Sequence, residues 1–314
     1  MSENIIDPEV VELISKLKSK YDQNGQDFKA YLEGLVYQEY TSYWDYIQVD
    51  TLLSLQKPKT DIPDEMIFIM YHQITELYFK LTLHEIKQIQ GKKQDLTIEF
   101  FIARLKRMNA YFRNLTHSFE IMIEGMEPAQ FLKFRMSLLP ASGFQSAQYR
   151  MIEILSTPLI NLVGISNREK LKNESLENQF ANIYWKNGAT ELSSGKKTLT
   201  LTQFEEKYSD DLFRLALDNQ NNLILDQYKN LKEAEKSNPE LIEAMKNFDM
   251  AVNIHWPLAH YKSAVKYLQK SPADIAATGG TNWQKYLPPR FQFRIFFPEL
   301  YTPTELENWG KTGF

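Results

Sequence analysis

The 314-residue sequence contains no cysteine. Without thiols the chain cannot form disulfides, thiolate zinc sites or iron–sulfur clusters, and it has no cysteine nucleophile. Glycine is also scarce, at 12 residues. Little glycine together with long periodic stretches favours helices over a β-sandwich or a barrel.

Two further absences narrow the choice of partners. The net charge is −4 and the pI is about 5.9, so the basic surplus typical of a nucleic-acid binder is missing. No apolar run approaches the roughly 20 residues that span a bilayer, and the charged, amphipathic N-terminal stretch has no apolar signal core. We therefore expect a cytoplasmic protein without nucleic-acid or membrane partners.

Helical periodicity dominates what is present. The 43% hydrophobic content suffices for one large domain or two small ones. Apolar residues recur at helical spacing in residues 64–90, 98–124 and 239–269, the last disturbed by Pro257. This pattern predicts an all-α helical bundle. Turn signals beside β-prone residues allow one small β-hairpin in residues 183–202.

Metal chemistry would have to draw on five histidines: His72, His84, His117, His255 and His260. No pair has metal-ligand spacing. Residues five apart lie about 140° apart around a helix, so His255 and His260 should not share a ligand. A site with a single histidine, such as haem with one axial imidazole, remains open.

In two predicted helices a polar residue lies on the same face as aromatic residues. Phe68 and His72 are one turn apart, as are Phe131 and Arg135. Such a histidine is commonly a core residue satisfied by a hydrogen bond, and such an arginine commonly pairs with a glutamate or solvent. The functional alternative is an apolar pocket whose guanidinium grips a substrate carboxylate through two parallel bonds.

Local patterns also single out two loops. Ser142 and Gln145 have capping-box spacing before a helical segment. Residues 277–282 combine glycines, hydroxyls and free backbone N–H groups but lack a Walker lysine, so they do not form a phosphate loop. Most loops of this kind are connections, and some are lids over ligands.

Taken in order, several segments resemble the tryptophan 2,3-dioxygenase family. They are YWDYIQVDTLLSLQKP at residues 43–58, DEMIFIMYHQITELYFK at 64–80, FRMSLLPASGFQSAQYRMIE at 134–153, and WPLAHYKSAVKYL at 256–268 with the later ATGG at 277–280. FFPEL at 296–300 is similar to bacterial members. The similarity extends over about residues 40–300 and is weakest over 162–241.

The resemblance implies a haem b cofactor, an all-helical subunit and a homotetramer. It implies insertion of both atoms of O₂ across the indole C2–C3 bond of L-tryptophan, which gives N-formyl-L-kynurenine and opens the kynurenine pathway. It further implies one haem dioxygenase domain over residues 1–314. Within it, residues 1–48 would contact a neighbouring subunit, and residues 162–241 would form a more variable helical insertion.

The principal site residues follow from the resemblance. His260 matches the proximal ligand of the haem iron, and His255 matches no ligand position. His72 matches the distal catalytic histidine that meets the indole N–H. Arg135 matches the partner of the substrate carboxylate, and Thr278 matches the loop threonine that contacts the ammonium and carboxylate groups.

Five further positions carry over in the same way. Phe68 matches the aromatic wall beside the distal histidine. Phe131 lies where members carry tyrosine or phenylalanine. Ser142 matches the serine near the haem edge. Tyr43 and Tyr46 match tyrosines that an N-terminal segment contributes to a neighbouring subunit's pocket.

The sequence departs from the family pattern at three places. Pro63 replaces the histidine before the Asp-Glu pair, and Thr281-Asn282-Trp283 replaces the usual serines and glycine after the loop glycines. Pro257 lies one turn before His260. The altered loop keeps a second hypothesis open, a related haem oxygenase of another aromatic amino acid or a substituted tryptophan. A third is a haem-binding helical protein without turnover, against which Phe68, His72, Arg135 and Thr278 together argue.

Overall fold

The structure is a computed structural model that describes residues 6–92, 95–190, 195–269 and 283–311. Within these residues the regular elements are helices, and the β-type pairing consists of two isolated antiparallel bridges, Val163–Ile183 and Thr190–Lys197. The prediction of an all-α fold is therefore confirmed. The chain divides into two compact units, Met1–Gln56 and Lys57–Phe314.

The first unit holds four helices. These are α1 (Pro8–Gln23), α2 (Phe28–Val36), α3 (Tyr43–Tyr46) and α4 (Val49–Leu53). Asp7 and Asp27 cap the first two through backbone N–H groups that donate to their carboxylates. Apolar side chains of this unit are exposed, among them Val10, Leu13, Ile14, Leu17, Leu35, Tyr37, Tyr43, Trp44 and Tyr46.

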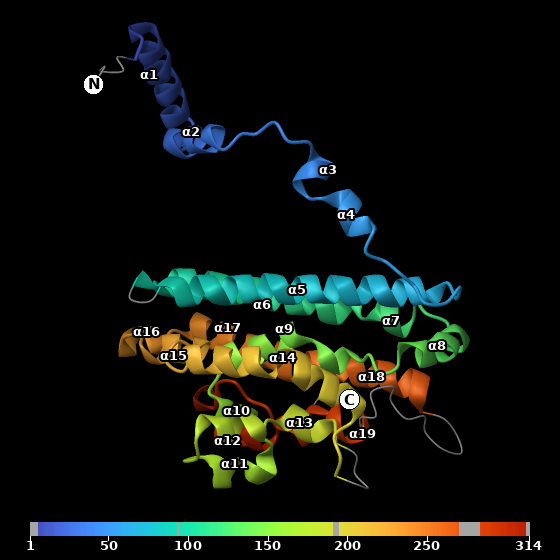
Figure 1. The fold of residues 1–314 in the computed structure, drawn as a ribbon. Coiled ribbons are helices and arrows are strands. Elements are labelled where there is room, and N and C mark those ends of the chain that lie inside the picture. The colour runs from blue at the N-terminus through green and yellow to red at the C-terminus, as the bar shows by residue number, and fades with distance from the viewer. Residues whose placement is uncertain (1–5, 93–94, 191–194, 270–282, 312–314) are drawn as a thin grey trace. The chain divides into compact units, whose positions relative to one another are not determined.

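Long helices form the frame of the second unit (Figure 1). Helix α5 (Asp64–Lys92) packs along α6 (Ile98–Ser118), and α17 (Pro239–Met250) packs against α6 from below. Helix α9 (Ala147–Ser156) lies between α5 and α14 (Leu199–Asp218). The buried face of α6 shows why this packing forms, since its fully enclosed side chains recur every three or four residues: Phe101, Leu105, Met108, Phe112 and Leu115.

The remaining α-helices of the second unit pack around this frame. They are α7 (Glu120–Ile123), α8 (Pro128–Phe134), α10 (Leu159–Leu162), α11 (Ile165–Leu171), α12 (Leu176–Ala181), α13 (Tyr184–Gly188), α15 (Ile224–Lys229), α16 (Glu233–Lys236), α18 (Trp256–Leu268), α19 (Trp283–Tyr286), α20 (Pro289–Gln292) and α21 (Pro303–Glu307). The region 162–241, expected to be a more variable helical insertion, thus contains α11 to α16.

The segment expected as one long helix at residues 239–269 is interrupted. Helix α17 passes into a π-helical turn, Ala251–His255, before α18 begins. Pro257 stands in the first turn of α18, directly after the π-helical turn, and it has no N–H to donate to that turn. The helix therefore changes its winding just before the proline.

The region of the expected hairpin is also helical. Ile183 and Trp185 are buried, and residues 184–188 form α13, while residues 199–202 begin α14. A single antiparallel bridge joins Thr190 to Lys197. Burial of these side chains in the core outweighs their β propensity, which depends strongly on context.

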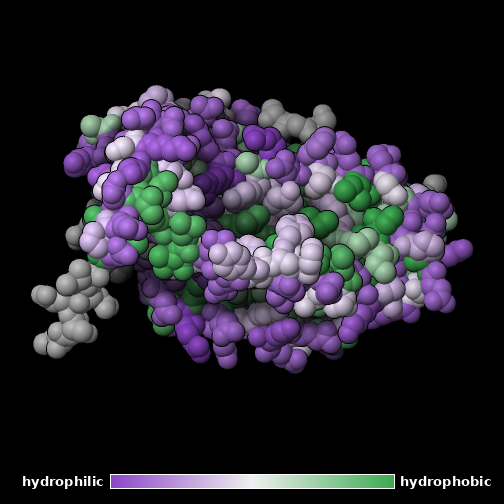
Figure 2. Space-filling model, turned by 90° about the horizontal axis from the view of Figure 1, so that it is seen from above, coloured by the Kyte–Doolittle hydropathy of each residue, from purple (hydrophilic) through white to green (hydrophobic). Residues whose placement is uncertain are grey.

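The face of the molecule seen in Figure 2 is mostly polar and carries gathered apolar patches. Helix α5 contributes four exposed apolar side chains at spacings of three or four residues: Met70, Ile74, Leu77 and Leu81. None of the helices in the described residues has the length and apolarity needed to cross a bilayer.

Candidate active site

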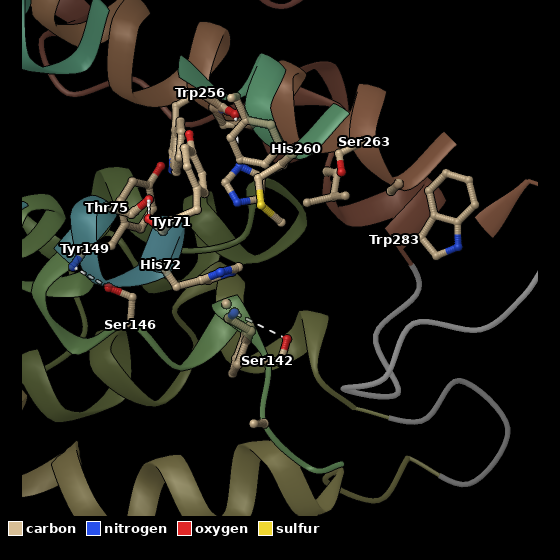
Figure 3. A pocket seen from close by; sticks show the side chains of 18 of the residues that line it. Tyr71, His72, Thr75, Ser142, Ser146, Tyr149, Trp256, His260, Ser263 and Trp283 are labelled. Carbon is tan, nitrogen blue, oxygen red and sulfur yellow. Dashed lines mark hydrogen bonds between the residues drawn. The ribbon is translucent and has the colours of Figure 1, made fainter. Parts of the chain in front are cut away.

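A cavity of about 330 Å³ lies in the second unit, between α5, α8, α9, α18 and α19. Aromatic side chains form much of its wall. They are Phe68, Tyr71, Phe79, Phe119, Phe131, Phe144, Tyr149, Tyr184, Trp185, Trp256, Tyr267 and Trp283. Both His72 and His260 line it, and Figure 3 shows their rings facing the same space from α5 and α18.

The hydrogen bond of His72 determines its tautomer. Its Nδ1 lies 2.7 Å from the carbonyl oxygen of Phe68, one turn earlier on α5. A carbonyl can only accept, so Nδ1 carries the proton and Nε2 presents a lone pair. Burial lowers the pKa of His72 below its ordinary value, which keeps the ring neutral at pH 7.

His260 repeats this arrangement on the opposite wall. Its Nδ1 lies 3.2 Å from the carbonyl oxygen of Trp256, so this nitrogen donates and Nε2 is left as the basic atom. Burial lowers the pKa of His260 to about 4. His255 lies in the π-helical turn with an exposed side chain and does not line the cavity.

Arg135 brings a cation to the cavity wall. It follows α8 directly and is 6% exposed. Burial lowers the pKa of its guanidinium, the direction expected for a cation removed from water. Phe131 lines the same wall, and its ring centroid lies 6.3 Å from that of Phe68. The two pairs identified in the sequence, Phe68 with His72 and Phe131 with Arg135, therefore line the same cavity.

Ser142 lines the cavity and caps a short turn. Its Oγ accepts the N–H of Phe144, while the side chain of Gln145 accepts the N–H of Ser142. The capping box predicted from the spacing is confirmed. Ser146 then caps α9 by accepting the N–H of Tyr149 at 3.3 Å (Figure 3).

A buried charged cluster on the cavity wall was missed from the sequence. Glu153, fully enclosed, pairs with Arg150 at 3.0 Å and with Arg294, and it accepts the hydroxyl of Tyr184 at 2.6 Å. Arg150 and Glu153 lie three apart on α9, but that spacing equally suits a solvated face. Two guanidinium groups and one carboxylate leave the cluster with a positive charge.

The cluster also has unused donors. The Nε atoms of Arg150 and Arg294 are buried and have no hydrogen-bond partner among the described residues. Both arginines line the cavity. Positive charge with orphaned donors suits an anionic group held in or beside this space.

Three further site residues were expected. Thr278 lies outside the described residues. Tyr43 and Tyr46 belong to α3 of the first unit, where their side chains are 73% and 80% exposed. Their roles as substrate contacts stay predictions. The described residues also contain no group of three or more His, Asp or Glu side chains able to hold a metal ion.

Fold and cavity together define a helical protein in which neutral imidazoles, aromatic rings and guanidinium groups line one cavity. The family model for tryptophan 2,3-dioxygenase matches residues 33–255, and the chain belongs to that family. This match includes Phe68, His72, Arg135 and Ser142 and ends five residues before His260.

Relatives bear the same name. The tryptophan 2,3-dioxygenase of Bradyrhizobium diazoefficiens is 27% identical over 280 residues, which is 83% of this chain and 90% of that protein. Those of Ruegeria sp. and Bacillus anthracis are each 43% identical, over 113 and 118 residues. These shorter matches cover 36% and 37% of this chain, and they span only 40% and 42% of the two relatives.

Proposed function

We propose that this protein is a haem-dependent dioxygenase that inserts O₂ across the indole C2–C3 bond of L-tryptophan to give N-formyl-L-kynurenine. The observation that carries the proposal is the pair His72 and His260. Both rings are neutral, both expose Nε2, and they line one cavity with the buried Arg135.

The cavity fits the proposed haem b in two respects. His260 offers a neutral imidazole with Nε2 free, the form that ligates iron, and its Nδ1–H is anchored on a carbonyl as metal-binding histidines require. The orphaned donors of Arg150 and Arg294 suit the propionate carboxylates, and Ser142 would contact the haem edge. When bound, haem supplies the oxygen chemistry.

The protein's own residues would bind and orient the substrate. Arg135 pairs with the carboxylate, which fixes the position of the ring. Phe68 and Phe131 enclose the indole, and this apolar wall excludes water. The Nε2 lone pair of His72 accepts the indole N–H. Thr278 is the proposed partner of the ammonium and carboxylate groups.

The test is a single turnover. Haem-reconstituted protein is reduced without oxygen, mixed with L-tryptophan and then with O₂. The proposal expects a product with the absorption and mass of N-formylkynurenine, and a visible spectrum that changes when tryptophan binds. Haem-loaded protein that forms no such product would contradict the proposed reaction.

A related substrate is the second candidate. Trp283, the last residue of the altered stretch, lines the cavity and is only 6% exposed. This bulky wall favours a ring of different shape, such as another aromatic amino acid or a substituted tryptophan. Parallel turnover assays with L-tryptophan, L-tyrosine and ring-methylated tryptophans decide between the two candidates by their kcat/KM ratios.

We further propose a cytoplasmic homotetramer built from one dioxygenase domain per chain. Residues 1–48 would contact a neighbouring subunit and place Tyr43 and Tyr46 near its pocket. The exposed aromatic and aliphatic side chains of the first unit support association, because apolar patches of this kind commonly mark interfaces.

A further inference from the structure

The π-helical turn before His260 creates an acceptor that its own helix cannot satisfy. In this turn each N–H donates to the carbonyl five residues earlier, and the N–H of Trp256 donates to the carbonyl of Ala251. The next donor in the ladder would be residue 257, and its acceptor would be Val252. Residue 257 is a proline and has no N–H.

The hydroxyl of Tyr149 takes the place of the missing donor. It lies 2.9 Å from the carbonyl oxygen of Val252 and donates to it. Tyr149 is on α9, 103 residues away in sequence, and Val252 is fully buried. Water does not reach this carbonyl, so a protein donor must satisfy it.

The hydroxyl is itself held in place. Nη1 of Arg294 donates to it at 3.2 Å, and Arg294 is paired with Glu153. The phenol ring packs on Phe79, with ring centroids 5.4 Å apart. Tyr149 therefore connects a fixed ion-paired cluster to the π-helical turn that precedes α18, the helix that carries His260.

We infer that Tyr149 is a positioning residue for His260, acting as the donor that Pro257 lacks. The inference rests on the proposed function only in that His260 is the haem ligand. His260 donates to the carbonyl of Trp256, the residue directly after the π-helical turn, so its ring orientation depends on where that turn ends. Figure 3 shows the His260 and Trp256 side chains side by side. Loss of the Tyr149 hydroxyl leaves Val252 unsatisfied and loosens the start of α18.

The test is a double-mutant cycle with two readouts. Tyr149→Phe keeps the ring and removes the donor, whereas Pro257→Ala supplies an N–H to the same carbonyl. Amide hydrogen exchange across residues 251–260 is measured on the apoprotein, and haem affinity is measured by titration. Tyr149→Phe should speed exchange and weaken haem binding by about tenfold, the change expected when a buried carbonyl loses its donor.

The decisive measurement is whether Pro257→Ala restores the Tyr149→Phe variant. The double variant should return both readouts to within about twofold of the wild type, because the Pro257→Ala change restores a hydrogen bond to the Val252 carbonyl. Tyr184→Phe is the matched control, since its hydroxyl contacts Arg294 and Glu153 in the same cluster but no carbonyl of the π-helical turn. Pro257→Ala should not rescue it.

The inference would be wrong if the double variant failed to fold or showed the same fast exchange and weak haem binding as Tyr149→Phe. It would also be wrong if Tyr149→Phe left the exchange rates unchanged, or if Pro257→Ala rescued Tyr184→Phe equally well. The exchange measurement needs no haem. If the wild-type protein bound no haem, the proposed function would be wrong. The exchange measurement on the apoprotein would still test the role of Tyr149.

Discussion

In both cavity histidines one ring nitrogen determines what the other can do. The Nδ1–H groups of His72 and His260 donate to carbonyls of their own helices. Each neutral ring therefore keeps Nε2 as its basic atom. Burial keeps both rings neutral by lowering their pKa values. Identical tautomers are thus proposed for two different tasks, iron ligation by His260 and acceptance of the indole N–H by His72.

The two histidines near the π-helical turn should respond differently to removal. His260→Ala is expected to abolish haem binding, because the cavity loses the imidazole proposed as the iron ligand. His255→Ala should retain haem, since this side chain is exposed and away from the cavity. The Soret band after reconstitution measures both. Loss of the band in His255→Ala alone would reverse the ligand assignment.

Arg135→Ala should impair substrate binding and leave haem in place. A lost charge-assisted hydrogen bond pair corresponds to about a 10- to 100-fold rise in KM for L-tryptophan. Steady-state kinetics with the Soret absorbance recorded in parallel provide the measurement. Lys133→Ala is the control, because Lys133 is a neighbouring basic residue with an exposed side chain. Equal KM values for the two variants would remove Arg135 from the site.

At the scale of elements, Glu153 joins three parts of the second unit. Arg150 shares α9 with it, Tyr184 comes from α13, and Arg294 comes from the segment after α20. Glu153→Gln leaves two buried guanidinium groups without their counter-charge. We expect the free energy of unfolding to fall by about 3–5 kcal/mol.

Denaturant unfolding measures this loss. Glu299→Gln removes an exposed ion pair with Lys229 and should cost no more than about 1 kcal/mol. A loss for Glu153→Gln as small as that of the control would show that the cluster is not a stabilising link.

Asp249 ties the C-terminal segment to α17. Its carboxyl accepts the N–H groups of Phe296 and Phe297 and the side-chain amide of Asn253. Desolvation by burial raises its pKa from 3.8 to about 7. Between about pH 4 and 7 the folded protein therefore holds a proton that the unfolded chain has lost, so this contribution to stability decreases as pH rises.

Asp249→Asn should remove that dependence. The wild-type free energy of unfolding should fall by on the order of a few kcal/mol more than that of the variant between about pH 4 and 7. Asp211→Asn, on the exposed side of α14, should follow the wild-type curve. Urea titrations across this range measure the slopes, and parallel curves for wild type and Asp249→Asn would contradict the expectation.

For the whole molecule, the sequence predicted what depends on nearby residues. The long helices followed from apolar spacing, and the capping box of Ser142 and Gln145 followed from a three-residue interval. The π-helical turn could not be predicted, because its donor Tyr149 lies far away in sequence. The Glu153 cluster was missed because charged residues on a helix are usually solvent-exposed.

At the scale of the whole molecule, the exposed apolar side chains of α5 are a candidate contact surface between chains. Leu77 is 48% exposed, so Leu77→Glu should leave the fold intact and weaken association of the chains. Light scattering coupled to size exclusion should report a smaller particle with unchanged circular dichroism. Lys80→Glu changes an exposed residue of the same helix and should keep the wild-type mass. An unchanged mass for Leu77→Glu would exclude this surface from the interface.

The π-helical turn also sets the rotational phase of everything after it. An α-helix advances about 100° per residue, and the turn between Ala251 and His255 absorbs one extra residue without that advance. Wound as an uninterrupted α-helix, the same residues would carry His260 by that angle around the axis and away from the cavity. The direction in which the His260 ring points is thus determined by a single inserted position in the turn that precedes its helix.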